Sequence, residues 1–266
     1  MLNKKTFDNK NLFFFFQHYF LLDNMASNHT SMEVNAEEIP EKGVGMEIEV
    51  GESRFNKDTY KFLTHLQIDK NEILFAAIEN ESPRIVEDLL KIGCDPNATD
   101  LNVDFERTPL SKALERNRID IAEILLQNGA DINATCCFRG QTVLHHAASY
   151  RKLEIVKFLL QHNANINALD YERTTPLYLA TIHDDNEIVK TLLINGANAN
   201  IQDNNELITP FFCAIEDIVK VYFDFAINLD FNKRDLEGDT PFEYMLKDNE
   251  LETFNIMKMI AYHQHS

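Results

Sequence analysis

Basic residues are scarce in this sequence. Its 266 residues contain 25 Lys and Arg against 43 Asp and Glu, so the formal net charge is −18. Because such a surface repels phosphate backbones, we expect no nucleic-acid partner. The acidic excess favours a protein partner with a basic segment, mainly through electrostatic steering.

Cysteine is also sparse, and the motifs of catalysis are missing. The four cysteines, Cys94, Cys136, Cys137 and Cys213, show no C-x-x-C spacing. This pattern indicates reduced thiols rather than a disulfide framework or a zinc site. Redox sensing by the adjacent cysteines Cys136 and Cys137 is the alternative. No phosphate-binding glycine motif and no nucleophile–base spacing occurs, so we expect no enzyme, metal or cofactor.

No apolar run is long enough to cross a bilayer as a helix. The run NLFFFFQHYFLL (Asn11–Leu22) follows three lysines and resembles the start of a secretory signal, but Gln17 and His18 interrupt it. Residues 1–25 are a tail, a weak signal-like segment, or an over-extended start ahead of Met25. We expect a cytoplasmic protein, with a nuclear location also open, and keep secretion as the minority alternative.

The rest of the chain changes character near Asp58. Residues 26–57 are polar, acidic and interrupted by glycine and proline, which predicts a disordered linker. Residues 58–266 carry apolar positions at helical spacing. A Thr-Pro or related pair recurs there in steps of 34, 33, 34 and 31, at Thr108, Thr142, Thr175, Thr209 and Thr240. A fixed step near 33 predicts stacked repeats.

Each repeat is predicted to form two helices. Thr caps the first helix and Pro fills its first turn, where no backbone N–H bond is lost. A polar turn and an apolar stretch such as IVKFLL follow. Gly93, Gly129 and Gly196 end the second helix where a left-handed residue is needed, and Asn163 takes that place in the middle repeat.

These units are similar to the ankyrin repeat, whose consensus contains T-P-L-H-x-A-A and G-A-D-V-N-A. TVLHHAA (142–148) and LEIVKFLLQHNANINA (153–168) carry the resemblance most clearly, and it extends over Asn71–His263. It implies an all-α solenoid of stacked helix-turn-helix units with β-hairpin loops. We expect six repeats, at about 71–100, 101–134, 135–168, 169–201, 202–233 and 234–266. The fifth has lost residues between its helices, so we expect it to be the weakest, and the sixth has the form of a terminal cap.

The resemblance implies a non-enzymatic module that binds another protein, as an adaptor, scaffold or inhibitor. Binding would use the hairpin tips and a concave groove, and we expect a monomer. A secreted or membrane-delivered effector is the alternative, because of the Phe-rich start. Only about 70 residues lie outside the repeats, which is too few for an ordinary catalytic domain.

One candidate binding surface is a row of aromatic residues in the predicted hairpin tips, each with an arginine close behind. Aromatic side chains and arginine dominate binding hot spots, so a row with one pair per repeat suits a protein partner. The alternative is that each ring packs on the neighbouring hairpin. The pairs are Phe105 with Arg107, Phe138 with Arg139, and Tyr171 with Arg173.

A second candidate surface is the end of each first helix, which contacts partners in this family. The positions carried over are Arg116, Tyr150, Ile182 and His183. Glu79 and Glu115 occupy such positions too and would favour a basic partner segment. His145 stands at the consensus histidine, which the resemblance assigns to hydrogen bonds within and between repeats. His146 lies on another face of the same helix and is a groove candidate.

The sequence predicts different costs for two truncations in the middle repeat. Leu159→Ala should lower the free energy of unfolding by about 2–5 kcal/mol, because buried leucine truncations leave a cavity. Phe138→Ala should cost far less if its ring serves a partner. Urea unfolding followed by circular dichroism compares the two, and equal losses would make Phe138 a packing residue.

Overall fold

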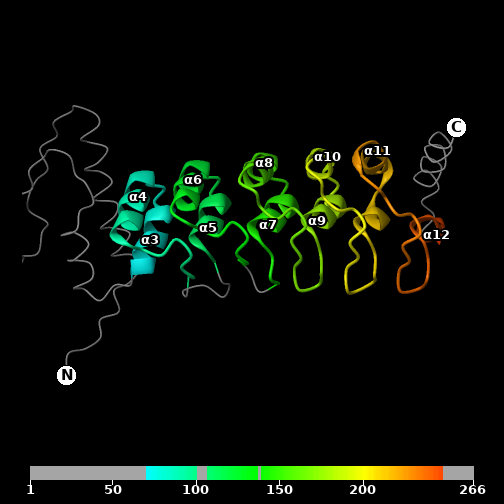
Figure 1. Cartoon of the computed structure of the whole chain (residues 1–266), viewed down its shortest axis with the longest axis horizontal. Helices are drawn as coiled ribbons and strands as arrows, with labels where there is room; N and C mark the ends of the chain where they lie inside the picture. The colour runs from blue at the N-terminus through cyan, green and yellow to red at the C-terminus, as the bar shows by residue number, and fades with distance from the viewer. Residues whose placement is uncertain (1–69, 101–106, 137–138, 248–266) are drawn as a thin grey trace, which may run out of the picture. The chain divides into compact units, whose positions relative to one another are not determined.

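The computed structural model describes residues 70–100, 107–136 and 139–247. These ranges contain ten α-helices, α3 to α12, one 3-10 helix, η2, and no strand (Figure 1). Within them, no helix has both the length and the apolar composition needed to cross a membrane. The predicted N-terminal segment, the linker and residues 58–69 of the predicted repeat region lie outside the described residues. The chain divides between Asp95 and Pro96 into two compact parts, which we describe separately.

The described residues of the first part, 70–95, form one helix pair. Helix α3 (Lys70–Glu79) and helix α4 (Pro83–Ile92) bury apolar side chains that include Ile78 and Leu89. Gly93 ends α4 with φ at 100°, and its backbone N–H donates to the carbonyl of Leu90 at 3.0 Å. The predicted left-handed stop is therefore confirmed at this repeat.

Three helix pairs follow one another between Pro109 and Ile194 in the second part. They are α5 (Pro109–Glu115) with α6 (Ile119–Gln127), α7 (Val143–Ser149) with α8 (Leu153–Gln161), and α9 (Pro176–Ile182) with α10 (Asn186–Ile194). First helix α7 contacts both α5 and α9, second helix α10 contacts α8, and the loops between pairs project to one side (Figure 1). The all-α repeat fold expected from the sequence is thus confirmed.

Equivalent leucines form the core between neighbouring repeats. Leu125 and Leu159 are fully buried in the second helices, and Leu192 has the same place in the next repeat. Full burial of one such side chain contributes about 1.5–3 kcal/mol. The repeated apolar phrase therefore reflects a packing problem that each repeat must solve in the same way.

The Thr-Pro pairs cap the first helices as predicted. The Thr108 hydroxyl accepts a hydrogen bond from the Ser111 backbone N–H at 3.1 Å, while the Ser111 hydroxyl oxygen accepts one from Thr108 N–H at 3.0 Å. Thr175 accepts from the backbone N–H of Tyr178 at 3.1 Å. These bonds satisfy amide groups that a helix start leaves without intrahelical partners.

A ladder of asparagine side chains joins successive repeats, and the sequence did not predict it. The Asn133 side-chain oxygen accepts a hydrogen bond from the Asn165 backbone N–H at 2.8 Å, and Asn167 accepts in the same way from Asn198 at 2.8 Å. Matching bonds run from Asp131 N–H to Asn97 at 2.6 Å and from Asp230 N–H to Asn200 at 2.8 Å. The asparagine of the "DINA" phrase therefore links repeats directly.

The loops between repeats are also linked through the backbone. Tyr171 N–H donates to the Arg139 carbonyl at 3.0 Å, and Asn204 N–H donates to the Glu172 carbonyl at 2.9 Å. Leu236 N–H donates to the Glu206 carbonyl at 2.9 Å. At each of these three boundaries a backbone hydrogen bond holds one loop against the next, which fixes the spacing of the side chains that these loops present.

The fifth repeat replaces a helix with aromatic packing. Its first element is only η2 (Pro210–Cys213), and α11 (Glu216–Phe225) begins after two intervening residues. The ring centroid of Phe211 lies 5.3 Å from that of Tyr222 and 5.6 Å from that of Phe231. These large side chains supply the volume that a regular first helix would occupy.

Tyr222 also ties the fifth repeat to the fourth. Its hydroxyl lies 2.6 Å from the hydroxyl oxygen of Thr181. Because the Thr181 hydroxyl donates to the Leu177 carbonyl at 2.9 Å, the proton in the Tyr222 contact comes from Tyr222. The buried phenol is therefore paired, as a buried polar group requires.

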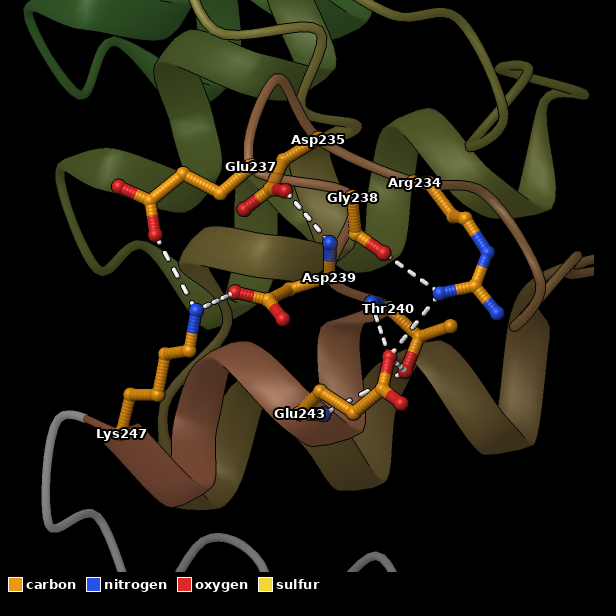
Figure 2. A network of polar contacts seen from close by, with 8 residues as sticks. All are labelled: Arg234, Asp235, Glu237, Gly238, Asp239, Thr240, Glu243 and Lys247. Atoms are coloured by element: carbon orange, nitrogen blue, oxygen red, sulfur yellow. Dashed lines mark hydrogen bonds and ion pairs between the residues drawn. The ribbon is translucent and has the colours of Figure 1, made fainter.

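Polar contacts surround the start of α12 (Pro241–Lys247) in the sixth repeat (Figure 2). The Glu243 carboxylate accepts from the Thr240 backbone N–H at 2.8 Å and from the Thr240 hydroxyl at 2.9 Å. These two bonds, with Arg234 close by, lower the pKa of Glu243. Lys247 contacts both Glu237 and Asp239. Each of these exposed contacts contributes little to the stability of the fold.

Hydrogen exchange should find the weak point of the stack. In a linear array of repeats the weakest interface opens first, and the fifth repeat has only a 3-10 turn in place of a first helix. Amide exchange should therefore be fastest from Asn204 onward. Mass spectrometry of deuterated fragments measures this, and uniform protection across repeats two to six would contradict it.

Candidate functional site

An open cavity of about 770 Å³ lies beside the first helices α5, α7 and α9, and we call it the groove. Five residues selected from the sequence as partner-binding line it: Arg107, Arg139, Tyr150, Ile182 and His183. They come from three repeats. The structure therefore brings together, on one surface, members of both predicted sets.

The helix-end residues occupy one structural position in successive repeats. Arg116, Tyr150 and His183 are the C-cap residues of α5, α7 and α9. Tyr150 is 69% exposed and Ile182 is 45% exposed, so the core uses little of either side chain. Arg116 is exposed as well, but it does not line the groove.

Side-chain contacts between repeats hold the edge of the groove. The Ser149 hydroxyl and His183 Nε2 lie 3.0 Å apart, and Arg151 Nε donates to the Asp185 carboxylate at 3.1 Å. Each contact joins the third repeat to the fourth. The position of His183 is thus set by its neighbour as well as by its own helix.

Of the predicted aromatic row, the structure describes Tyr171. Its ring lies against the backbone of Gly140 so closely that a Cβ on that glycine would stand 2.5 Å from Tyr171 Cε1. Gly140 has φ at 70°, which also favours glycine. Tyr171 is nevertheless 73% exposed, so the ring packs on the neighbouring loop and still offers a face to a partner.

The other members of the row are placed as follows. Phe105 and Phe138 lie outside the described residues. Arg173 is exposed and adopts a positive φ of 61° at its loop. Arg107 and Arg139 line the groove, whereas Tyr171 and Arg173 do not. The hairpin row and the groove are thus adjoining but distinct surfaces at the described positions.

The adjacent histidines His145 and His146 have different surroundings: His145 lies in the core and His146 lines the groove. His145 is fully buried, its Nδ1 accepts from Thr142 N–H at 3.1 Å, and its Nε2 donates to the Thr174 carbonyl at 3.0 Å. This geometry assigns a neutral ring that links the third and fourth repeats, and burial lowers the pKa of His145. His146 lines the groove, and burial lowers its pKa as well.

Two residues that line the groove were assigned no binding role, or a different role, from the sequence. Lys152 lines the groove from the turn between α7 and α8, and its place two residues after Tyr150 was the available signal. Cys136, expected in an exposed hairpin if it were a redox sensor, is buried, and its thiol donates to the Gln141 carbonyl at 3.3 Å. Cys137 lies outside the described residues.

A metal or redox centre finds no support in the described ranges. There, no three or more His, Cys, Asp or Glu side chains gather in a way that could hold a metal ion. Burial raises the pKa of the Cys213 thiol to about 11, so this thiol is protonated and poorly nucleophilic at neutral pH. The arrangement at the groove is suited to holding another molecule by contact.

Successive two-helix repeats whose loops are joined by backbone hydrogen bonds define a helical repeat protein with an open groove along its first helices. The profile of ankyrin repeats (3 copies) matches residues 53–136 and 134–203. The chain therefore belongs to the ankyrin repeat family. Ankyrin repeats mediate binding to other proteins and are typically non-enzymatic.

Segments of known proteins resemble this chain. The human 2-5A-dependent ribonuclease is 36% identical over 69 residues, which are 24% of this chain and 8% of that protein. Mouse inversin is 37% identical over 79 residues, 30% of this chain and 7% of inversin. An ankyrin repeat protein of fowlpox virus (strain NVSL) is 39% identical over 77 residues, 29% of this chain and 39% of the relative. The likeness therefore spans less than half of each relative.

The buried His145 predicts a pH dependence of stability. Because its folded-state pKa is depressed, the unfolded state takes up a proton first as pH falls below about 6.5. Stability is full above that pH and declines below it until the folded-state pKa is reached. His145→Gln should therefore reduce the loss of unfolding free energy between about pH 7.5 and about pH 5.5.

Urea unfolding at each pH measures this dependence. His183→Gln, which replaces an exposed histidine of the next repeat, serves as the comparison for the loss of one imidazole. An unchanged dependence in His145→Gln would show that His145 titrates alike in the folded and unfolded states.

Proposed function

We propose that this protein is a non-enzymatic adaptor, scaffold or inhibitor that holds a protein partner along the groove and the adjoining loops. The observation that carries the proposal is the convergence in one groove of five residues selected from the sequence for binding. Three of them, Arg107, Arg139 and Tyr150, are of the types that dominate binding hot spots.

The exposed apolar side chains give the groove its affinity for a partner. Tyr150 and Ile182 lie at its edge with 69% and 45% of their surfaces exposed. Covering apolar surface contributes about 25 cal/mol per Å² removed from water, before the costs of association. A partner segment that covers both side chains gains this contribution to the binding free energy. In the unbound protein both side chains face water.

We place this activity in the cytoplasm or nucleus. Cys94, Cys136 and Cys213 form no disulfide within the described residues. Reduced thiols fit a reducing compartment. Buried thiols such as Cys94 would also serve the core without any redox role.

Affinity capture from native extract tests the proposal. The double variant Tyr150→Ala/Ile182→Ala should lose a partner that the intact protein retains, because both contacts at the groove edge are gone. Ile194→Ala is the matched control, since Ile194 is 59% exposed at the end of α10 and does not line the groove. Circular dichroism confirms that each variant is folded.

A second variant locates the partner on the loops. Phe105→Ala/Phe138→Ala/Tyr171→Ala removes the aromatic row and leaves the groove side chains in place. If only this variant loses the partner, the principal binding site lies at the hairpin tips. Retention by both variants would contradict the proposal.

A further inference from the structure

The loops that begin the fourth, fifth and sixth repeats present apolar side chains to water. Tyr171, Leu207 and Leu236, one from each loop, are 73%, 39% and 65% exposed. Backbone hydrogen bonds hold these loops together, and one of them joins Leu236 N–H to the Glu206 carbonyl at 2.9 Å. We call this surface the loop edge; its members are Tyr171, Leu207 and Leu236, together with Glu172, Glu206 and Glu237.

Leu207 occupies a loop position whose backbone favours glycine. The residue two places before the capping threonine has a positive φ in four successive repeats, at 70°, 61°, 57° and 85° for Gly140, Arg173, Leu207 and Gly238. A leucine at such a φ crowds its own backbone, whereas a glycine does not. Because Leu207 is still 39% exposed, packing within the chain recovers only part of this cost. Contact with a partner would account for an apolar side chain at this place.

Two carboxylates of the loop edge are unpaired. Glu172 and Glu206 are exposed, and neither side chain forms a hydrogen bond or ion pair with any residue that the structure describes. Glu237 differs, because Lys247 lies 3.1 Å from its carboxylate (Figure 2). A bound segment would therefore meet the free carboxylates of Glu172 and Glu206 beside the exposed leucines.

The charge of the same loops is negative. Residues 169–174, 202–208 and 233–239 contain more acidic than basic side chains, with Asp170, Glu172, Asp203, Glu206, Asp235, Glu237 and Asp239 against Arg173, Lys233 and Arg234. Arg234 is itself paired with Glu243 at 3.2 Å. Outside the described ranges, acidic side chains outnumber basic ones both in residues 1–69 and in residues 101–106, 137–138 and 248–266. Those segments carry no net positive charge that would reverse the sign.

We propose that the loop edge takes a basic segment of a protein partner that also carries an apolar side chain. Lysine or arginine side chains of the segment lie against Glu172 and Glu206, and its apolar side chain lies against Leu207 and Leu236. Burial of the leucines supplies affinity, while the carboxylates set the charge of the partner. This inference rests on the proposed function and names the chemistry of the partner at the loops that adjoin the groove.

Selection from a phage-displayed random peptide library on the immobilised full-length chain tests the inference. Peptides that bind the wild type and not Leu207→Gly/Leu236→Ala depend on the loop edge, and they should be net basic with an apolar residue. Loop-edge peptides that are neutral or acidic would overturn the inference. Peptides lost only in Tyr150→Ala/Ile182→Ala would also overturn it and leave the proposed function standing. If neither variant loses any peptide, both proposals fail.

A charge variant then tests the two unpaired carboxylates. For the most enriched loop-edge peptide, labelled with fluorescein, Glu172→Gln/Glu206→Gln should weaken binding by about three- to tenfold, and the loss should shrink at high salt. Glu154→Gln/Glu187→Gln is the matched control, because it removes the same charge from exposed positions in the first turns of α8 and α10. These helices lie on the side of the stack opposite the loops (Figure 1). Equal losses in both variants would show a general field effect and overturn the assignment to the loop edge.

Leu207→Gly separates a binding role from a packing role. Because glycine relieves the positive φ, the urea midpoint of this variant should stay at or near that of the wild type. Its affinity for the same labelled peptide should nevertheless fall by about five- to tenfold, because the apolar contact is lost. A lowered midpoint with unchanged affinity would make Leu207 a packing residue and overturn its place in the site.

Discussion

Neighbouring repeats in the described part of residues 96–247 share one buried apolar surface, and this shared surface is the constraint on which the other features depend. Leu125, Leu159 and Leu192 are fully buried at equivalent places because the same interface recurs. Polar bonds follow the same period: Asn133 accepts from the backbone of Asn165, and the loops exchange one backbone bond at a boundary. A residue at a helix end or loop tip is therefore held in register with its equivalents.

That register explains how much could be predicted from the sequence. The helix pairs, the threonine caps and the left-handed stop at Asn163 each depend on neighbours within a few residues, so local pattern was sufficient. Tyr150 and Ile182 were found because the repeat period assigns them a position in the fold. The asparagine ladder was missed because its partners lie about one repeat away, and the sequence does not specify their hydrogen-bond directions.

The lining of the groove could not be fully predicted for a different reason. Net charge averages over every residue, whereas a bound segment meets a few side chains that the fold selects. Lys152 reaches the groove from a turn, and Glu115 lies 3.5 Å from Arg107 Nε. Neither fact follows from composition. The fifth repeat is a similar case, since a missing stretch in the sequence does not reveal that Phe211 and Tyr222 pack into the space.

The position of the groove follows from which repeats have a complete first helix. Helices α5, α7 and α9 each end at a C-cap residue, and two of these, Tyr150 and His183, line the groove. In the fifth repeat η2 stops after Cys213, and the chain enters α11 through Ala214 and Ile215 without a comparable helix end. The shortened repeat thus cannot continue the row of helix-end residues. Its aromatic rings pack against one another instead, and the row of helix-end residues stops at the fourth repeat.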